Sequence, residues 1–145
     1  MADKRLFFKL NRAQHLLYIH VEQECQKLLG VTPVQLGAIF FLLRNDGCLQ
    51  KDLARGLHLN KPAVTGLVGR MEKAGLVTRE DDPGDARVTK VFLTDRSRDI
   101  AGRAFPLLER LNGMITRGFT GEELQVIHRF IDSLINLLAG EDMYE

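Results

Sequence analysis

Apolar residues recur every three or four positions at both ends of the chain, and this spacing predicts long helices there. Residues 3–29 are expected to form one helix, which Gly30 ends. Two more helices are expected later in the chain, over residues 95–118 and 121–140. The apolar stripes of the first and last helices are wider than a surface helix needs, so they indicate a partner beyond the chain's own core.

Shorter elements follow one another in the middle of the chain. Thr32–Gln35 has the sequence of a capping box and opens a helix that runs to about Arg44. Cys48–Leu49 is expected to form a minimal strand. Two short helices come next. One covers Gln50–Gly56, and the other begins at Asn60, whose side chain can cap a first helical turn.

A β-hairpin is predicted after the second short helix. Leu76–Arg79 is expected to form one strand, and Val88–Leu93 the returning strand, because it is rich in β-branched residues. Glu80–Asp85 is expected to form the turn, with Pro83–Gly84 at its two central positions. Helix, helix and hairpin in this order predict a winged helix, so the expected fold is mainly α with a small β-wing.

The second short helix has two different faces. Its outer face is slim, polar or basic and includes Gly66 and Gly69, each of which costs about 1 kcal/mol relative to alanine. A helix that enters a major groove needs small residues, hydroxyls and cations on its outer side. The alternative is an ordinary two-helix corner, in which the glycines permit tight helix packing. The inner, apolar face comprises Val64, Leu67, Val68 and Met71.

The hairpin carries basic residues and could lie along a minor groove or a phosphate backbone. Its tip also holds four carboxylates within six residues, which DNA would repel unless they are paired. Asp85 paired with Arg87 or Arg79 is one solution. The alternative is a solvated hairpin without a partner. The residues expected to contact DNA are Gln50, Lys51, Asn60, Lys61, Pro62, Thr65, Gly66, Gly69, Arg70, Arg87 and Lys90.

Four segments carry a resemblance to a known family. They are QKDLA at 50–54, NKPAVTGLVGRMEKAGLVTR at 60–79, Asp85-Ala86-Arg87, and Leu93-Thr94. In this combination and spacing, the chain resembles the MarR family of winged helix-turn-helix transcriptional regulators. The resemblance covers nearly the whole chain, but it is specific only between residues 50 and 94.

The sequence departs from the family pattern at three positions. Leu49 stands where a hydroxyl residue is usual, and Ser97 where glycine is usual. Gly66 stands where a longer and often basic residue is common. The operator sequence therefore does not follow from the resemblance.

The family's architecture implies three parts: an N-terminal dimerisation helix (1–31), a winged helix-turn-helix (32–94) and C-terminal dimerisation helices (95–145). A two-fold homodimer would present its recognition helices to successive major grooves of a palindromic operator, about 34–36 Å apart. The residues expected in the dimer interface are Leu6, Phe7, Leu10, Leu17, Leu124, Ile127, Ile131, Leu134 and Leu138.

Family members often bind a small phenolic or anionic effector between the winged domain and the dimer helices, and DNA is then released. In this chain Arg12, His15 and Tyr18 could line such a pocket. The alternative is that these three are polar surface or interface residues. No cofactor is expected.

Composition and charge limit the mode of binding. The chain has 145 residues, 45% of them apolar, and a net charge of only +1. Between Gly47 and Arg98, ten Lys and Arg face seven Asp and Glu, which gives +3. Specific binding would therefore depend on groove fit and dimerisation rather than on bulk charge. The absence of a signal-peptide pattern and of a long apolar run predicts a cytoplasmic protein without membrane contact.

Other chemistry finds little support. Cys25 and Cys48 have neither metal-type nor disulfide spacing, the histidines show no ligand pattern, and no nucleophile–base arrangement indicates an enzyme. Two alternatives to a ligand-released repressor stay open. One is a winged-helix module that binds protein instead of DNA, and the other is a redox regulator acting through Cys25. Because Cys25 lies on the apolar stripe, an inert buried thiol is the competing interpretation.

Overall fold

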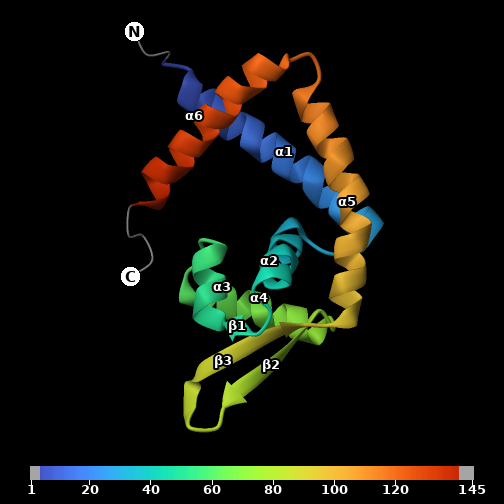
Figure 1. Ribbon diagram of the computed structural model, residues 1–145, viewed down its shortest axis with the longest axis vertical. Coiled ribbons are helices and arrows are strands. Elements are labelled where there is room, and N and C mark those ends of the chain that lie inside the picture. Colours follow the sequence, from blue (N-terminus) through green and yellow to red (C-terminus); the bar gives the residue numbers. More distant parts are fainter. Residues whose placement is uncertain (1–3, 141–145) are drawn as a thin grey trace. The chain divides into compact units, whose positions relative to one another are not determined.

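The computed structural model describes residues 4–140, whose course is shown in Figure 1. Its helices and a three-stranded antiparallel sheet confirm the predicted fold class. The chain forms two compact units, one ending at Gly102 and one beginning at Arg103. The elements are α1 (Leu6–Leu29), α2 (Pro33–Arg44), β1 (Cys48–Leu49), α3 (Gln50–Gly56), α4 (Lys61–Lys73), β2 (Val77–Asp82), β3 (Asp85–Leu93), α5 (Asp95–Thr116) and α6 (Gly121–Ala139).

The predicted boundaries of α1 and α2 depend on local backbone chemistry. The first helix begins at Leu6, slightly later than predicted, and residues 1–3 lie outside the described part of the chain. Gly30 ends it in the left-handed conformation, with φ at +70°. The expected capping box then opens α2, because Thr32 and Gln35 each accept a hydrogen bond from the other's backbone N–H.

The core of the first unit lies between α2, α3, α4 and the sheet. Burial of each large aliphatic side chain there contributes about 1.5–3 kcal/mol relative to exposure. The apolar face predicted for α4 is buried in full, which fixes the orientation of that helix. Side chains with almost no exposure are Ile39, Leu42, Leu53, Val64, Val68, Met71, Leu76, Val77 and Val91.

The turn between α3 and α4 requires two unusual residues. His58 has φ at +54°, in the left-handed region that histidine adopts more readily than most side chains. Gly56 lies against the ring of Phe41, and a Cβ at this position would come within 2.1 Å of a ring carbon. The close approach of α2 and α3 therefore depends on this glycine.

The hairpin is longer than its sequence predicts, and its turn is shorter. The sheet order is β1-β3-β2, with Val77 opposite Leu93 and Glu80 opposite Lys90. Only Pro83–Gly84 forms the turn, so the prediction of a turn over 80–85 is wrong at both ends. Cross-strand contacts extend the ladder into the acidic segment, and Thr89 donates a hydrogen bond to Asp81 at 2.9 Å.

Hydrogen bonds join the wing to the start of α5. Asp46 accepts a hydrogen bond from the backbone N–H of Leu93 at 2.8 Å and forms an ion pair with Arg98 at 2.9 Å. Ser97 is completely buried, and its hydroxyl donates to the carbonyl of Leu76. The serine that replaces the family's usual glycine is therefore satisfied within the fold.

The last two helices have different degrees of burial. Leu107 and Leu111 of α5 are buried, while Met114 and Ile115 are exposed. A capping box that includes Thr120 opens α6. Within residues 4–140, none of the residues of α6 is buried. The apolar face of α6 is therefore not covered by other residues of the described protomer.

None of the helices within residues 4–140 is by itself long and apolar enough to cross a membrane. The pair α1 and α2 passes such a test of length and composition only when taken together, across a bend of 70°. Four residues of α2 are buried in the core, which accounts for its apolar composition.

We expect Asp46→Ala to lower the free energy of unfolding by about 2 kcal/mol, because it leaves the Leu93 N–H without its acceptor. The exposed ion pair with Arg98 should add little to this loss. Asp46→Asn is the matched control: its amide oxygen can still accept from Leu93, so the loss should be less than half as large. Urea unfolding of all three proteins at one protein concentration measures the difference. Equal losses in both variants would show that the carboxylate charge, not the backbone hydrogen bond, holds this junction.

Candidate nucleic-acid interface

The N-terminus of α4 is built as predicted. The side chain of Asn60 accepts a hydrogen bond from the N–H of Ala63 at 2.9 Å, and Pro62 occupies the first turn. Lys61 and Pro62 are both exposed. The carboxamide oxygen of Asn60 is thus used by the helix, and only its amide nitrogen is left to donate to another molecule.

The two glycines of α4 are not explained by packing within the protomer. A Cβ at Gly69 would have no atom of the described chain within 4 Å. A Cβ at Gly66 would approach only the guanidinium of Arg70, at 3.1 Å. The idea that these glycines permit tight helix packing is therefore wrong for the described protomer. They keep the outer face of α4 slim.

A hydrogen-bonded network joins α3 to α4. The hydroxyl of Thr65 donates to the carbonyl of Lys61 at 2.9 Å and accepts from the Nε2 of Gln50 at 3.3 Å. Gln50 therefore faces α4. Its Oε1 is buried and, within residues 4–140, has no hydrogen-bond partner. Leu49, which stands where a hydroxyl residue is usual in the family, gives α3 no side-chain cap.

The carboxylate of Asp85 holds Arg87 in position on the wing. Its guanidinium donates to both oxygens of Asp85, at 3.0 and 3.2 Å, and its backbone N–H donates to the same carboxylate at 3.0 Å. These bonds, the side-chain one first, lower the pKa of Asp85. Arg79 instead pairs with Glu72 at 3.1 Å, so of the two suggested partners only Arg87 contacts Asp85. The side chain of Arg87 is 90% exposed.

The wing and the start of α3 lie side by side. A hollow of about 330 Å³ is lined by Lys51 and Gln50 from α3 and by Asp85, Arg87 and Thr89 from β3, together with their apolar neighbours. Two of the predicted cationic DNA contacts, Lys51 and Arg87, thus border one surface depression. Lys90 is exposed on the same strand, opposite Glu80.

A second cleft, of about 450 Å³, lies between α1, α2 and α4. Of the three residues suggested for an effector pocket, Tyr18 lines this cleft, but Arg12 and His15 are not among its lining residues. Residues of α2 and α4 supply most of its walls, which the spacing of polar residues along α1 did not predict. The lining residues are Tyr18, Thr32, Val34, Gln35, Leu59, Pro62, Ala63, Gly66, Leu67 and Arg70.

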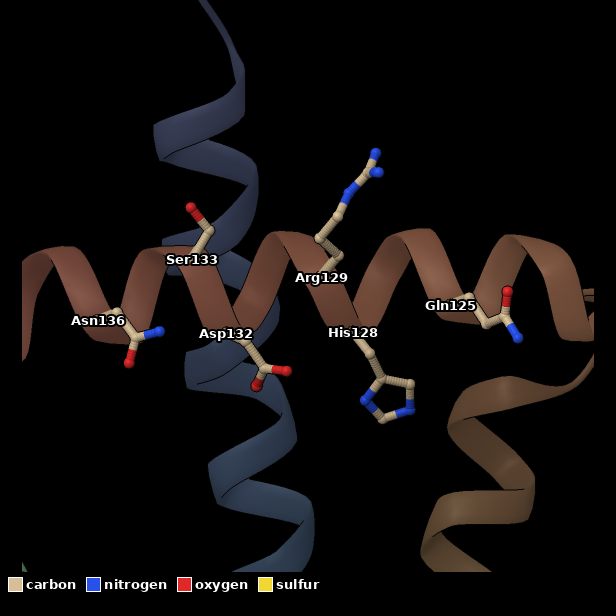
Figure 2. Close-up of a pocket in the computed structure, with 6 residues that line it drawn as sticks. All are labelled: Gln125, His128, Arg129, Asp132, Ser133 and Asn136. Atoms are coloured by element: carbon tan, nitrogen blue, oxygen red, sulfur yellow. The ribbon is translucent and has the colours of Figure 1, made fainter.

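A third hollow lies along α6 and has a different character. Figure 2 shows that its polar side chains all project from this one helix. They recur at helical spacing and form the polar face of an amphipathic helix. The lining residues are Gln125, His128, Arg129, Asp132, Ser133 and Asn136. A search of residues 4–140 finds no cluster of His, Cys, Asp or Glu that could hold a metal ion.

The environments of the two cysteines oppose a reactive thiolate. Cys25 is completely buried, and burial raises the pKa of its thiol. Cys48 is half-buried, and burial followed by the nearby Asp52 carboxylate raises its thiol pKa. Both thiols are therefore protonated near neutral pH, which does not favour redox sensing through Cys25.

Fold and site together define a winged helix-turn-helix protein of the DNA-binding type. Residues 29–88 match the family model described as MarR family. An uncharacterised HTH-type transcriptional regulator of Bacillus subtilis, YcgE, is 33% identical over 138 residues, which cover 94% of this chain and 86% of that protein. The chain belongs to the MarR family of transcriptional regulators.

Solved structures agree with this fold. Sco3205, a MarR family regulator from Streptomyces coelicolor crystallised with DNA, has a TM-score of 0.84 at 22% identity, covering 94% of this chain and 88% of that one. The organohalide-sensing regulator RdhR, solved with 2,4-dichlorophenol, has a TM-score of 0.83 at 19% identity, covering 92% and 79%.

We expect Arg87→Ala to raise the pKa of Asp85 towards its ordinary value, because the largest cause of the lowered pKa is removed. A carboxylate with a lowered folded-state pKa stabilises the fold above its ordinary pKa, and this contribution is lost as pH falls through the folded value. Arg79→Ala, which removes an equal charge from the same hairpin, should leave the Asp85 pKa unchanged. Side-chain carboxyl shifts in an NMR pH titration measure both. An unchanged Asp85 pKa in Arg87→Ala would show that the pair does not persist in solution.

Proposed function

We propose that this regulator acts as a two-fold homodimer that binds a palindromic operator and represses transcription until a small ligand releases it. The observation that carries the proposal is the outer face of α4. That face is slim, polar and basic, and no other part of the described protomer packs against its glycines. A protein helix of this shape fits a major groove, where base edges must come close to the backbone.

The recognition surface would use its residues in different ways. Lys61 stands at the start of α4, where the helix dipole also favours a phosphate. Arg70, one turn beyond Gly66, can reach a phosphate or a guanine edge. Its guanidinium lies near the place that a side chain on residue 66 would occupy. Arg70 would in this way replace the basic residue that relatives often carry at position 66.

The wing and α3 would supply contacts to the DNA backbone. Asp85 holds Arg87 through two guanidinium nitrogens, and the remaining nitrogen and its hydrogens can still donate to the minor groove or to a phosphate. Lys51 borders the same hollow, and Lys90 is exposed on β3. The exposed carboxylates of Glu80, Asp81 and Asp82 would have to stay at a distance from phosphates.

Dimerisation would cover the apolar faces that the protomer leaves exposed. Phe7 of α1 is 70% exposed, and every residue of α6 is exposed or half-buried. Apolar faces of this size mark an interaction surface. Of the predicted interface residues, Leu10, Leu124 and Leu134 are half-buried in the protomer. The exposed ones are Leu6, Phe7, Leu17, Ile127, Ile131 and Leu138.

The proposed organisation keeps three parts, residues 1–31, 32–94 and 95–145, with the outer two in the dimer. The start of α5 also serves the middle part, since Ser97, Ile100 and Ala101 are buried. A helix that begins in the winged domain and continues towards the dimer region can carry a change of position between them.

The cleft between α1, α2 and α4 is the proposed effector site. Apolar side chains and the Tyr18 ring line it, and Arg70 adds a cation, which suits a small phenolic or anionic molecule. The structure of RdhR with 2,4-dichlorophenol is consistent with this ligand class. Arg12 and His15 are not part of the proposed site, because they do not line the cleft.

We expect Arg87→Ala to weaken binding to the chain's own upstream DNA by roughly ten- to a hundredfold per half-site, because a charge-assisted hydrogen bond is worth about 1.5–3 kcal/mol. The salt dependence of log Kd should become shallower by about one per lost phosphate contact. The melting temperature and the dimer should be nearly unchanged, since the side chain is 90% exposed. Fluorescence anisotropy across a salt series measures the affinity and its slope.

Arg79→Ala is the control for the Arg87 measurement, because it removes a hairpin cation that is paired with Glu72. Its DNA affinity should fall less. A large drop in melting temperature for Arg87→Ala would instead show that Arg87 stabilises the fold. No DNA binding by the wild-type protein at low salt would favour the protein-binding module, for which the acidic wing is the supporting feature.

We expect Ile131→Glu to convert the dimer to monomers, because an unpaired carboxylate in an apolar interface costs several kcal/mol. The protomer should keep its helical circular dichroism, since Ile131 is exposed in the protomer. Asn136→Glu adds the same charge to the polar face of the same helix (Figure 2) and should leave the dimer intact. Sedimentation velocity distinguishes the two species. Two dimeric variants would exclude this face of α6 from the interface.

A further inference from the structure

We infer that Thr65 reads the operator through its methyl group, and that the base it recognises is a thymine. The inference rests on the proposed function, since it assigns a base preference to the surface already proposed to enter the groove. It depends on how the hydrogen-bonding capacity of the Thr65 hydroxyl is distributed.

A threonine hydroxyl offers one donor and two acceptor sites. In this protein the donor is used by the carbonyl of Lys61, one turn earlier in α4, at 2.9 Å. One acceptor site is used by the side-chain amide of Gln50, at 3.3 Å. The hydroxyl therefore has no hydrogen left for a phosphate, for guanine N7 or O6, or for thymine O4.

The two hydrogen bonds also fix the side chain. Threonine in a helix commonly adopts a rotamer in which the hydroxyl bonds the carbonyl one turn back. The Gln50 amide reaches the same oxygen from α3, so the hydroxyl is held from two helices. Gln50 is therefore a positioning residue for Thr65, and not the free phosphate ligand that its place at a helix start predicts.

The methyl is the apolar part of the Thr65 side chain and takes no part in the hydrogen bonds that hold the hydroxyl. Thr65 is exposed, and a Cβ built at Gly69, one turn further along α4, would meet no atom of the described chain within 4 Å. The space at Gly66 is approached by the guanidinium of Arg70. In the major groove, the apolar group that a base presents is the C5-methyl of thymine, and contact between two methyl groups is a known form of readout.

The remaining acceptor lone pair defines the competing outcome. It could accept a hydrogen bond from the amino group of adenine or cytosine. Readout by that route would require the hydroxyl and would not depend on a pyrimidine methyl. Substitutions in the protein and in the DNA separate these two routes.

The test begins with selection of an operator by the wild-type protein from a pool of random duplexes. Each thymine of the selected half-site is then replaced by uracil, symmetrically in both halves, which removes one methyl and keeps every hydrogen-bonding group. Fluorescence anisotropy at one salt concentration gives Kd for the wild type, Thr65→Val and Thr65→Ser. Thr65→Val keeps a methyl and removes the hydroxyl, whereas Thr65→Ser does the reverse.

For the wild type we expect one thymine position at which uracil weakens binding by about fourfold per half-site, the value for burial of one methyl-sized group. Thr65→Val should keep this preference for thymine over uracil at that position, and Thr65→Ser should lose it. The DNA substitution acts on the unmodified protein, so it needs no variant to fold.

Three results would overturn the inference and leave the DNA-binding proposal intact. They are a wild type that is insensitive to uracil at every position, a Thr65→Ser protein that still prefers thymine, and a Thr65→Val protein that has lost the preference. Failure of the wild type to enrich any sequence would overturn the DNA-binding proposal and this inference with it. Strong but methyl-insensitive binding would overturn the inference alone.

Discussion

The burial of one face of α4 is the constraint on which the rest of the structure depends. Val64, Leu67, Val68 and Met71 pack into the core almost without exposure, so the helix cannot rotate about its axis. Every residue on the opposite side is then held outward. Because interiors are close-packed, a small rotation of α4 would open cavities along the whole contact. The shape of the outer face is thus maintained by the stability of the domain.

Functional groups around α4 are held by short-range polar contacts instead of by burial. Asn60 caps the helix, Gln50 fixes the hydroxyl of Thr65, and Asp85 holds Arg87. Each of these contacts uses hydrogen-bonding capacity that is then not available to DNA, and each orders a side chain before DNA binds. Preorganisation of this kind reduces the entropy that binding must overcome. Preorganisation matters for this chain because its net charge is only +1. Bulk electrostatic attraction to DNA is therefore weak and could offset little of the entropy lost on binding.

The flanking helices obey a different constraint. Their apolar faces remain exposed in the protomer, and α6 buries none of its residues within the described chain. Since such faces are unfavourable in water, the most economical cover is a second copy with the same surface. Dimerisation would at the same time set the distance between two recognition helices. The same interface would therefore cover the apolar faces and determine how the two recognition helices are spaced on DNA.

Helices, caps and the apolar face of α4 could be read from the sequence, because they depend on spacing and on local chemistry. The capping residues Thr32 and Asn60 form their predicted bonds. The length of the hairpin could not be read in this way, since acidic residues such as Asp81 join the ladder only through cross-strand partners.

Only the tertiary structure decided which residues meet across elements. It assigned Asp85 to Arg87 and Arg79 to Glu72, and it turned Gln50 towards Thr65. It also placed Tyr18 in a cleft without Arg12 and His15. The contact between Gln50 and Thr65 joins residues 15 positions apart, and hydrophobic periodicity contains no information on such distances. The two ion pairs are closer in sequence, but they still depend on how the strands and α4 orient each side chain. The sequence by itself determined the elements and the face that α4 buries, and the packing of those elements determined what each outward side chain is free to do.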